Sequence, residues 1–88
     1  MVRKELKVLN ENGIHARPAA QIVETCARFR CSITLIKDGF RANGRSILNI
    51  MLLAAEFGAA VWVEAEGEDE VEALAAVEHL FLARFRNE

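Results

Sequence analysis

Histidine, arginine and proline lie close together at His15, Arg17 and Pro18, within the stretch NGIHARPAAQIVE. Proline is favoured in the first turn of a helix, where its missing N–H costs nothing, so Pro18 indicates that a helix begins here. Histidine is not a preferred residue for the start of a helix, which Ser, Thr, Asp or Asn would hold better. The imidazole of His15 therefore needs a chemical explanation.

The chemistry that this arrangement favours is phosphorylation of the imidazole. The helix dipole disfavours the cationic ring, so His15 keeps a neutral, nucleophilic nitrogen at pH 7. A phosphoryl group there would lie against the N–H groups of Ala16 and Arg17, and the Arg17 guanidinium would clamp it. Such a site needs no metal, and the predicted phosphate-binding residues are Ala16, Arg17 and Pro18. A loop histidine beside a solvated arginine is the other interpretation, and the spacing alone leaves both open.

The length, composition and net charge of the chain limit the number of domains and the classes of partner. The 88 residues, of which 52% are hydrophobic and 27% charged, predict one domain spanning residues 1–88. A net charge of −2 gives no general attraction to nucleic acid or to an anionic membrane. No apolar run approaches the ~20 residues of a membrane span, and no signal-peptide core is present, so we expect a cytoplasmic protein. Cys26 and Cys31 are expected to be reduced, buried thiols.

Seven elements are predicted, in the order β-α-β-β-α-β-α. Four strands with one apolar face each, together with three helices, predict an α+β sandwich, in which helices cover one face of a largely antiparallel sheet and the other face is open. Alternation predicts strands at 2–9, 31–36, 40–43 and 60–66, and helical periodicity predicts helices at 16–28, about 46–58 and about 68–86.

Helical periodicity also predicts which side chains face the core. The last helix has two competing apolar stripes, of which the first is the expected inward one: Leu74, Val77 and Phe81, or Val71, Leu82 and Phe85. The first helix is expected to bury Ala16, Ala19, Ala20, Ile22, Val23, Cys26 and Ala27. Its opposite face is expected to carry Arg17, Gln21, Glu24, Thr25 and Arg28.

Ser46 is the second candidate site. Serine is a preferred N-cap, so Ser46 is expected to begin the second helix, with Asn49 making an incomplete capping box. A phosphate on this serine would also lie at a helix N-terminus, where its charge is tolerated. Ser46 is therefore a candidate regulatory phosphorylation site, although the sequence shows an acceptor and not a kinase.

The second helix has more apolar residues than one buried stripe needs. A helix on a sheet buries one stripe, which we expect to be Ile50, Leu53 and Phe57. The other side carries Ile47, Leu48, Met51, Leu52 and Ala55. We expect an exposed apolar patch there, rimmed by Arg17 and Arg45, of the kind that binds partner proteins, although loops or a second copy could cover it. The predicted partner-binding residues are Ala20, Arg45, Ile47, Leu48, Met51 and Leu52.

Three motifs carry a resemblance that covers essentially the whole chain. They are G-I-H-A-R-P-A at 13–19, R-S-I-L-N-I-M-L-L-A-A-E-F-G-A at 45–59 and G-E-D-E at 67–70. Together they resemble the HPr family, the histidine-containing phosphocarriers of the bacterial phosphoenolpyruvate-dependent phosphotransferase system. The resemblance implies an open-faced β-sandwich fold, with the element order predicted above.

The resemblance also implies roles and partners. His15 would take phosphate on Nδ1 from enzyme I and pass it to an enzyme IIA, in sugar uptake or its regulation, while Arg17 steadies the phosphate. In many bacteria an ATP-dependent kinase phosphorylates the serine that corresponds to Ser46. The resemblance implies a monomeric carrier with a transient phosphohistidine, which is not a self-contained enzyme and has no cofactor.

The chain departs from the family pattern in charge. Positions that are often basic in well-known members are Glu24, Ala27 and Asn49 here, so the enzyme I, the acceptor and the branch of the family, sugar-type or nitrogen-type, stay open. An alternative function is a regulatory module that binds its partner through the apolar patch under the control of Ser46. A third is a small-ligand-binding domain, for which no set of pocket-lining polar residues is visible.

Overall fold

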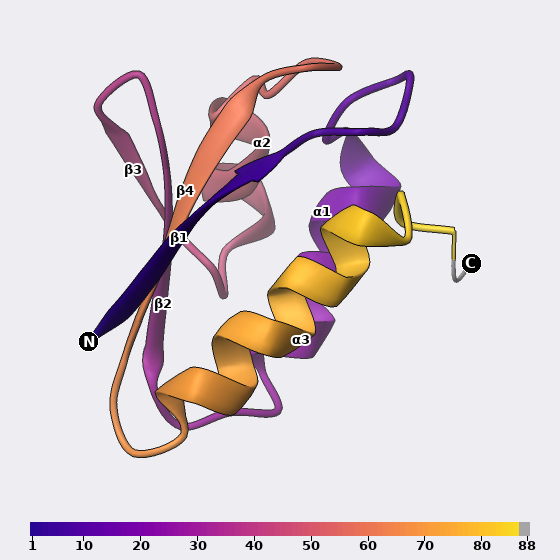
Figure 1. Ribbon diagram of the computed structural model, residues 1–88. Helices are drawn as coiled ribbons and strands as arrows, with labels where there is room; N and C mark the ends of the chain where they lie inside the picture. The colour runs from indigo at the N-terminus through magenta and orange to yellow at the C-terminus, as the bar shows by residue number, and fades with distance from the viewer. Residues whose placement is uncertain (87–88) are drawn as a thin grey trace.

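The computed structural model describes residues 1–86 and has the predicted element order (Figure 1). This order confirms the prediction, although all three helices end earlier than expected. The strands are β1 (Val2–Lys7), β2 (Ser32–Lys37), β3 (Phe40–Asn43) and β4 (Ala60–Glu66). The helices are α1 (Ala16–Cys26), α2 (Ile47–Leu52) and α3 (Glu70–Leu82).

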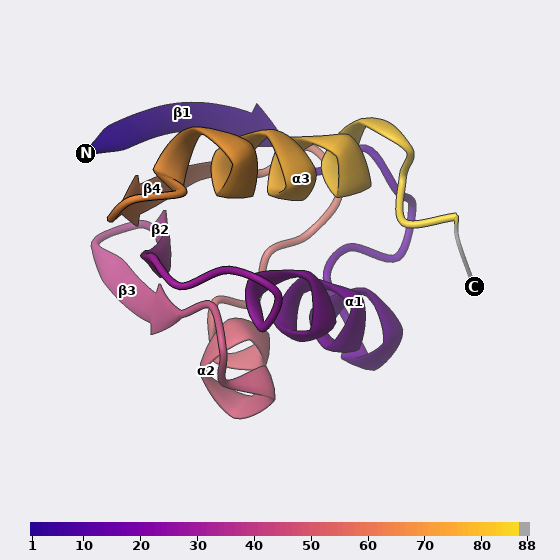
Figure 2. The same cartoon turned by 90° about the horizontal axis from the view of Figure 1, so that it is seen from below.

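The four strands form one sheet in the order β1-β4-β2-β3, and all three ladders are antiparallel. Central strand β4 pairs Val61 with Leu6 of β1 and Val63 with Leu35 of β2. Figure 2 shows the three helices together on one side of this sheet. The predicted α+β open-faced sandwich is therefore confirmed.

The core lies between the sheet and the helices. Strand residues on the helix side, such as Leu35, Val61 and Val63, are fully buried, because alternate side chains of a strand point to the same face. On the open face, the Arg3 guanidinium lies 4.3 Å from the centre of the Trp62 ring. Arg3 and Arg41 both form ion pairs with Glu64, so long polar side chains cover the outer face.

The predicted inward face of α1 is right at its centre and wrong at its ends. Ala19, Ile22 and Cys26 are buried, but Ala16 and Ala27 are exposed because they lie at the two ends of the helix. Thr25, which the sequence placed on the outer face, is buried. The buried stripe is displaced towards Thr25 because α1 contacts α3 as well as α2.

The prediction that α2 continues to Gly58 is wrong, because the helix ends at Leu52. Ala54 has a φ of 51°, which interrupts the helix. Ile50 and Leu53 are buried as expected, whereas Phe57, expected to face inward, is 59% exposed. Ala55, expected on the outer side, is buried, and its carbonyl accepts a hydrogen bond from the N–H of Ile14 at 2.8 Å. The segment after α2 therefore supports the loop before α1.

Helix α3 buries the first of its two candidate stripes. Val77 and Phe81 are buried and Leu74 partly so, whereas Val71 and Leu82 are each 64% exposed. The helix ends at Leu82 and not near residue 86, because residues 84 and 85 have left-handed φ angles. That conformation costs a residue with a Cβ about 1 to 2 kcal/mol. Phe85, a member of the rejected stripe, is buried all the same, because this turn brings it back onto Phe81.

The start of α3 is joined to the loop before β2. Both carboxylate oxygens of Asp69 accept backbone N–H groups, from Arg30 at 2.9 Å and Cys31 at 3.0 Å. These hydrogen bonds, the Arg30 N–H first, hold the pKa of the Asp69 carboxyl below its usual range. Cys26 and Cys31 are free and buried as predicted, and burial raises the pKa of the Cys26 thiol to about 11. Within residues 1–86, no helix has both the length and the apolar composition that crossing a bilayer requires.

Candidate functional site

His15 occupies the N-cap position of α1, in extended backbone geometry with φ −94° and ψ −161°. Its carbonyl accepts the N–H of Ala19 at 3.0 Å, which closes the first turn of the helix. Its side chain makes no capping hydrogen bond, and no acidic residue lies in the first turn. The first N–H groups of a helix have no partner inside the helix, so those of Ala16 and Arg17 are available to an anion.

A tight turn holds His15 in this position. The Asn10 side-chain amide donates to the Gly13 carbonyl at 2.5 Å, and the Gly13 N–H donates to the Asn10 carbonyl at 3.1 Å. Gly13 has a φ of +70°, and a Cβ at this position would lie 2.5 Å from the Ala55 carbonyl oxygen. Only glycine fits this approach between the two segments. The buried side chain of Ile14 and its N–H bond to Ala55 complete the attachment.

The imidazole lies at a small cavity of about 140 Å³. Three segments line it: the turn with Asn10, Glu11 and Asn12, the start of α1 with His15, Arg17 and Pro18, and the chain after α3 with Arg84 and Phe85. Arg17 therefore lines the same cavity as His15. Two arginines and one glutamate are among the residues that line the cavity, and this excess of positive charge suits an anion such as a phosphoryl group.

The sequence did not identify Arg84 as part of this site. An arginine near the end of a helix has an ordinary explanation, because basic residues favour the C-terminal end of a helix dipole. Only the packing of α3 beside α1 brings it to His15.

Ser46 is the N-cap of α2, as predicted. Its hydroxyl oxygen accepts the Asn49 N–H at 3.2 Å. The Asn49 side-chain oxygen accepts the Asn43 N–H at 3.2 Å and does not return to Ser46, so the capping box is incomplete, as expected. At the start of α2 the Ser46 side chain therefore accepts one of the free helix N–H groups, whereas the His15 side chain accepts none at the start of α1.

His15 and Ser46 lie at opposite ends of an antiparallel helix pair. Ile14, before α1, bonds to Ala55, after α2. At the other end Arg45, before α2, donates through its guanidinium to the carbonyl of Phe29, after α1. Arg17 and Arg45 therefore do not lie together, but at the two ends of the predicted patch.

The outer side of α2 is an exposed apolar surface. Leu48 is 69% exposed and Leu52 59% exposed, while Ile47 and Met51 are exposed to a lesser degree. Phe57 adds to the exposed apolar residues near this helix, which the sequence did not predict. Ala20 is only partly buried, on the neighbouring helix α1. The four α2 residues therefore match the predicted exposure, and they form what we call the α2 surface.

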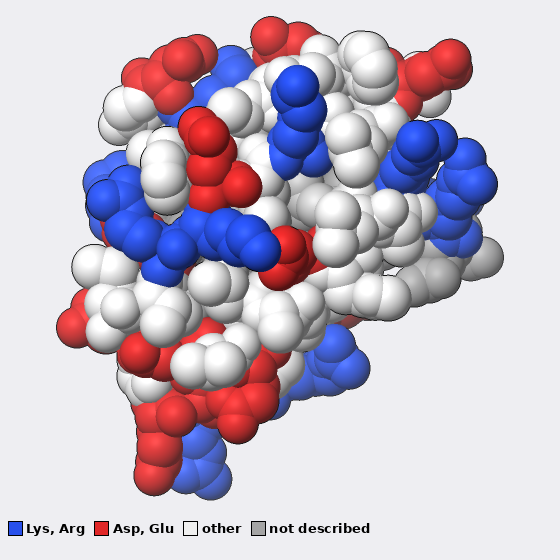
Figure 3. All heavy atoms as spheres, viewed as in Figure 1, with Lys and Arg blue, Asp and Glu red and all other residues white. Residues whose placement is uncertain are grey.

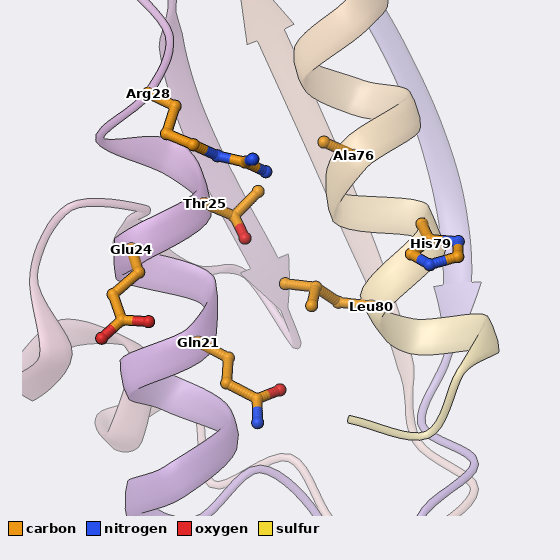
Figure 4. Close-up of a pocket in the computed structure, with 7 residues that line it drawn as sticks. All are labelled: Gln21, Glu24, Thr25, Arg28, Ala76, His79 and Leu80. Carbon is orange, nitrogen blue, oxygen red and sulfur yellow. The ribbon is translucent and has the colours of Figure 1, made fainter. Parts of the chain in front are cut away.

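A larger groove of about 530 Å³ lies between α1 and α3, away from His15. Figure 4 shows Gln21 and Thr25 of α1, and Arg28 of the turn after it, pointing towards α3, while Glu24 points away. His79, on the other wall, is an exposed residue of α3. Among residues 1–86, no group of three or more His, Cys, Asp or Glu side chains is placed to hold a metal ion.

Comparison with known proteins assigns the chain to a family. The family described as "PTS HPr component phosphorylation site" matches residues 2–83. The chain belongs to this family. It is 47% identical to the phosphocarrier protein HPr of Treponema pallidum over 88 residues, which cover all of both chains. It is thus an HPr-family protein of the phosphotransferase system.

Solved structures of HPr proteins have the same fold. A crystal structure of HPr-C-His from Thermoanaerobacter tengcongensis superposes with a TM-score of 0.94 at 39% identity, covering 100% of this chain and 99% of that one. A crystal structure described as an HPr dimer from the same organism has a TM-score of 0.78 at 39% identity, covering 97% of this chain and 98% of that one.

Proposed function

We propose that this HPr-family protein is a phosphocarrier that accepts a phosphoryl group on His15 from phosphorylated enzyme I and donates it to an enzyme IIA. Phosphoenolpyruvate is the ultimate donor, and the transfer serves sugar uptake or its regulation. The observation that carries this proposal is the uncapped start of α1, where His15 opens onto a cavity that also contains Arg17.

The chemistry at His15 is a nucleophilic transfer. The lone pair of Nδ1 forms a bond to phosphorus as the bond from phosphorus to the donor breaks, and the other ring nitrogen keeps its proton. The N–H groups of Ala16 and Arg17 and the Arg17 guanidinium stabilise the negative oxygens, while Pro18 fixes the first turn that presents them. The return transfer to the acceptor restores the neutral ring, so the chain is a carrier and needs no cofactor for this step.

The α2 surface is the proposed docking site for enzyme I and enzyme IIA, with Ala20 and Arg45 at its borders. Two different partners must recognise one surface, and the flexible side chain of Met51 suits such adaptable contacts. Glu24 on α1 and Ala27, the residue that follows α1, are exposed, so this protein presents an acid and a neutral residue where familiar members are often basic. We propose that these positions select the cognate partners by charge.

We also propose that the chain acts as one domain and as a monomer. The α2 surface must be free when a partner docks, which a stable dimer through that surface would prevent. Sedimentation equilibrium at micromolar concentration checks this: a monomer mass is expected, and a dimer that persists on dilution would contradict it.

The proposed function is tested by labelling with phosphoenolpyruvate and the cognate enzyme I. Wild type should take up one phosphate, labile in acid and stable in alkali, as expected of a phosphohistidine. The His15→Ala variant should take up none, and Ser46→Ala, the matched control at the other helix start, should be labelled like wild type. Labelling of His15→Ala equal to that of wild type would show that His15 is not the acceptor.

A regulatory role at Ser46 is the second candidate function. The observation that favours it is position: Ser46 immediately precedes the exposed residues Ile47 and Leu48, so a charge added there changes the α2 surface. An ATP-dependent serine kinase would supply that phosphate. Ser46→Asp should weaken or redirect binding to enzyme I in calorimetry, while Ser46→Ala should bind like wild type. Equal affinities of both variants would remove the support for this role.

A further inference from the structure

The chain after α3 has a backbone conformation that suits glycine but contains arginine. Arg84 and Phe85 have φ angles of 57° and 54°. The Phe85 N–H donates to the Leu80 carbonyl and the Arg84 N–H to the Phe81 carbonyl, both at 3.0 Å. These two bonds form a Schellman motif, in which Arg84 takes the left-handed position that glycine usually occupies.

Burial explains the strained conformation of Phe85 but not the identity of residue 84. The Phe85 side chain is 2% exposed, and its ring centre lies 5.1 Å from that of Phe81, so its packing stabilises the turn. The Arg84 side chain is exposed and contributes no comparable packing. A glycine at position 84 would form the same turn with less strain. The arginine is therefore better explained by what its guanidinium can reach.

Arg84 lines the cavity beside His15. It lines this cavity together with Arg17, whereas Arg86, two residues later, does not. Figure 3 shows basic side chains gathered at the edge of the molecule where α1 begins and α3 ends. Glu11 also lines the cavity, and its carboxylate opposes the binding of an anion. A second guanidinium offsets that charge.

We propose that Arg84 is a second phosphate-binding arginine, which contacts the phosphoryl group on His15 together with Arg17. This inference rests on the proposed function. The planar guanidinium donates several N–H bonds in a fixed geometry, so two arginines can bind different oxygens of one phosphoryl group. The turn at residues 84 and 85 positions the second of them, because the buried ring of Phe85 fixes the chain immediately beyond it.

The test compares Arg84→Gly, Arg84→Lys and Arg86→Gly with wild type. Each protein is equilibrated with enzyme I at a fixed ratio of phosphoenolpyruvate to pyruvate, and the phosphorylated fraction gives the equilibrium constant for phosphoryl transfer. Arg84→Gly should lower this constant about five-fold, Arg84→Lys should lower it less, and Arg86→Gly should leave it unchanged. The melting temperature of unphosphorylated Arg84→Gly should be equal to or above that of wild type, because glycine relieves the strain.

The outcomes separate this inference from the proposed function. If wild type is labelled and the equilibrium constant for phosphoryl transfer is unchanged in Arg84→Gly, the role of Arg84 is overturned and the carrier function stands. Equal losses in Arg84→Gly and Arg86→Gly also overturn it, because they indicate a general effect of positive charge. Absence of labelling in wild type overturns the proposed function itself, and the inference with it.

Discussion

The helices α1 and α2 begin in opposite ways. At α1 the N-cap is His15, whose side chain makes no capping bond, so the free N–H groups of the first turn remain available. At α2 the N-cap is Ser46, whose hydroxyl accepts the Asn49 N–H. The first start can bind a ligand, and the second is already satisfied by the protein. The residue at the N-cap therefore decides whether the helix amides serve function or stability.

The start of α3 is a third arrangement that supports this comparison. Its N-cap, Asp69, bonds to Arg30 and Cys31 of a neighbouring loop, and the Glu70 carboxylate accepts the Gly67 N–H at 3.0 Å. Acidic residues in the first turn of α3 neutralise the partial positive charge of its N-terminus. The first turn of α1 has no acidic residue, so the N-terminus of α1 keeps this charge. The Asp69 side chain does not cap its own helix either, but its bonds to the loop and the acidic first turn tie this start to the fold, whereas the start of α1 has no acidic residue.

The largest effect on the open start is expected from Gly13→Ala. The new Cβ would meet the Ala55 carbonyl oxygen at 2.5 Å, in a backbone conformation that already disfavours alanine. We expect a loss of about 2 to 4 kcal/mol in the free energy of unfolding, measured by urea denaturation. Gly39→Ala is the matched control, because Gly39 also has a positive φ but no atom lies within 4 Å of its Cβ position. A loss in Gly13→Ala no larger than in the control would show that the contact with Ala55 does not hold the turn.

Asp69→Asn is expected to have the next largest effect, and one that depends on pH. The folded-state pKa of Asp69 is lowered, so its stabilisation is fully present above the ordinary carboxyl pKa and is lost as pH falls through the folded-state value. The variant should therefore melt several degrees below wild type at pH 7, and the difference should shrink below about pH 4.

Glu68→Gln, a change at an exposed neighbour, is the control for Asp69→Asn and should melt like wild type at both pH values. A difference between Asp69→Asn and wild type that stays constant from pH 7 to pH 2 would contradict the electrostatic account of this bridge.

Ser46→Ala should have a smaller effect, because it removes one N-cap hydrogen bond. The expected loss is about 1 kcal/mol in the free energy of unfolding, measured by urea denaturation. Ser32→Ala is a suitable control, since the Ser32 hydroxyl makes only a long bond of 3.4 Å at an exposed position. If the two variants lose the same stability, the start of α2 is not closed by Ser46 as described.

His15→Ala should have the smallest effect on stability. Because the imidazole is exposed and caps nothing, the free energy of unfolding should change by less than about 0.5 kcal/mol. The same variant should lose phosphate acceptance completely. A loss of stability like that of Ser46→Ala would mean that His15 is a structural cap, and the contrast between the two helix starts would fail.

The sequence predicts local features of this fold well. Pro18 marks the start of α1, Ser46 marks the start of α2, and alternation identifies the apolar faces of the strands. The sequence shows these features because helix starts and strand faces are determined by residues that are close together in the chain. The early end of α2, before Ala54, could not be predicted, since the segment that follows is bonded to Ile14, which is far away in the sequence. The burial of Thr25 depends likewise on the position of α3.

The candidate site likewise contains residues that are close together in the sequence and a residue that only the fold brings near. His15 and Arg17 are two residues apart at one helix start, so the sequence itself places them near each other. Arg84 is separated from His15 by almost the whole chain, and an arginine near a helix end is ordinarily explained by the helix dipole. Its position beside His15 follows from the packing of α3 beside α1 together with the left-handed turn after α3, and the sequence has no glycine there that would predict this turn.

The central claim is that the open start of α1, and not the closed start of α2, receives the phosphoryl group. Amide ¹H–¹⁵N NMR spectra recorded before and after phosphorylation by enzyme I and phosphoenolpyruvate test it directly. The account predicts large shifts of the Ala16 and Arg17 N–H signals, as these groups gain a charged acceptor, and little change at Asn49. Unchanged Ala16 and Arg17 signals in the phosphorylated protein, or larger shifts at Asn49, would contradict it.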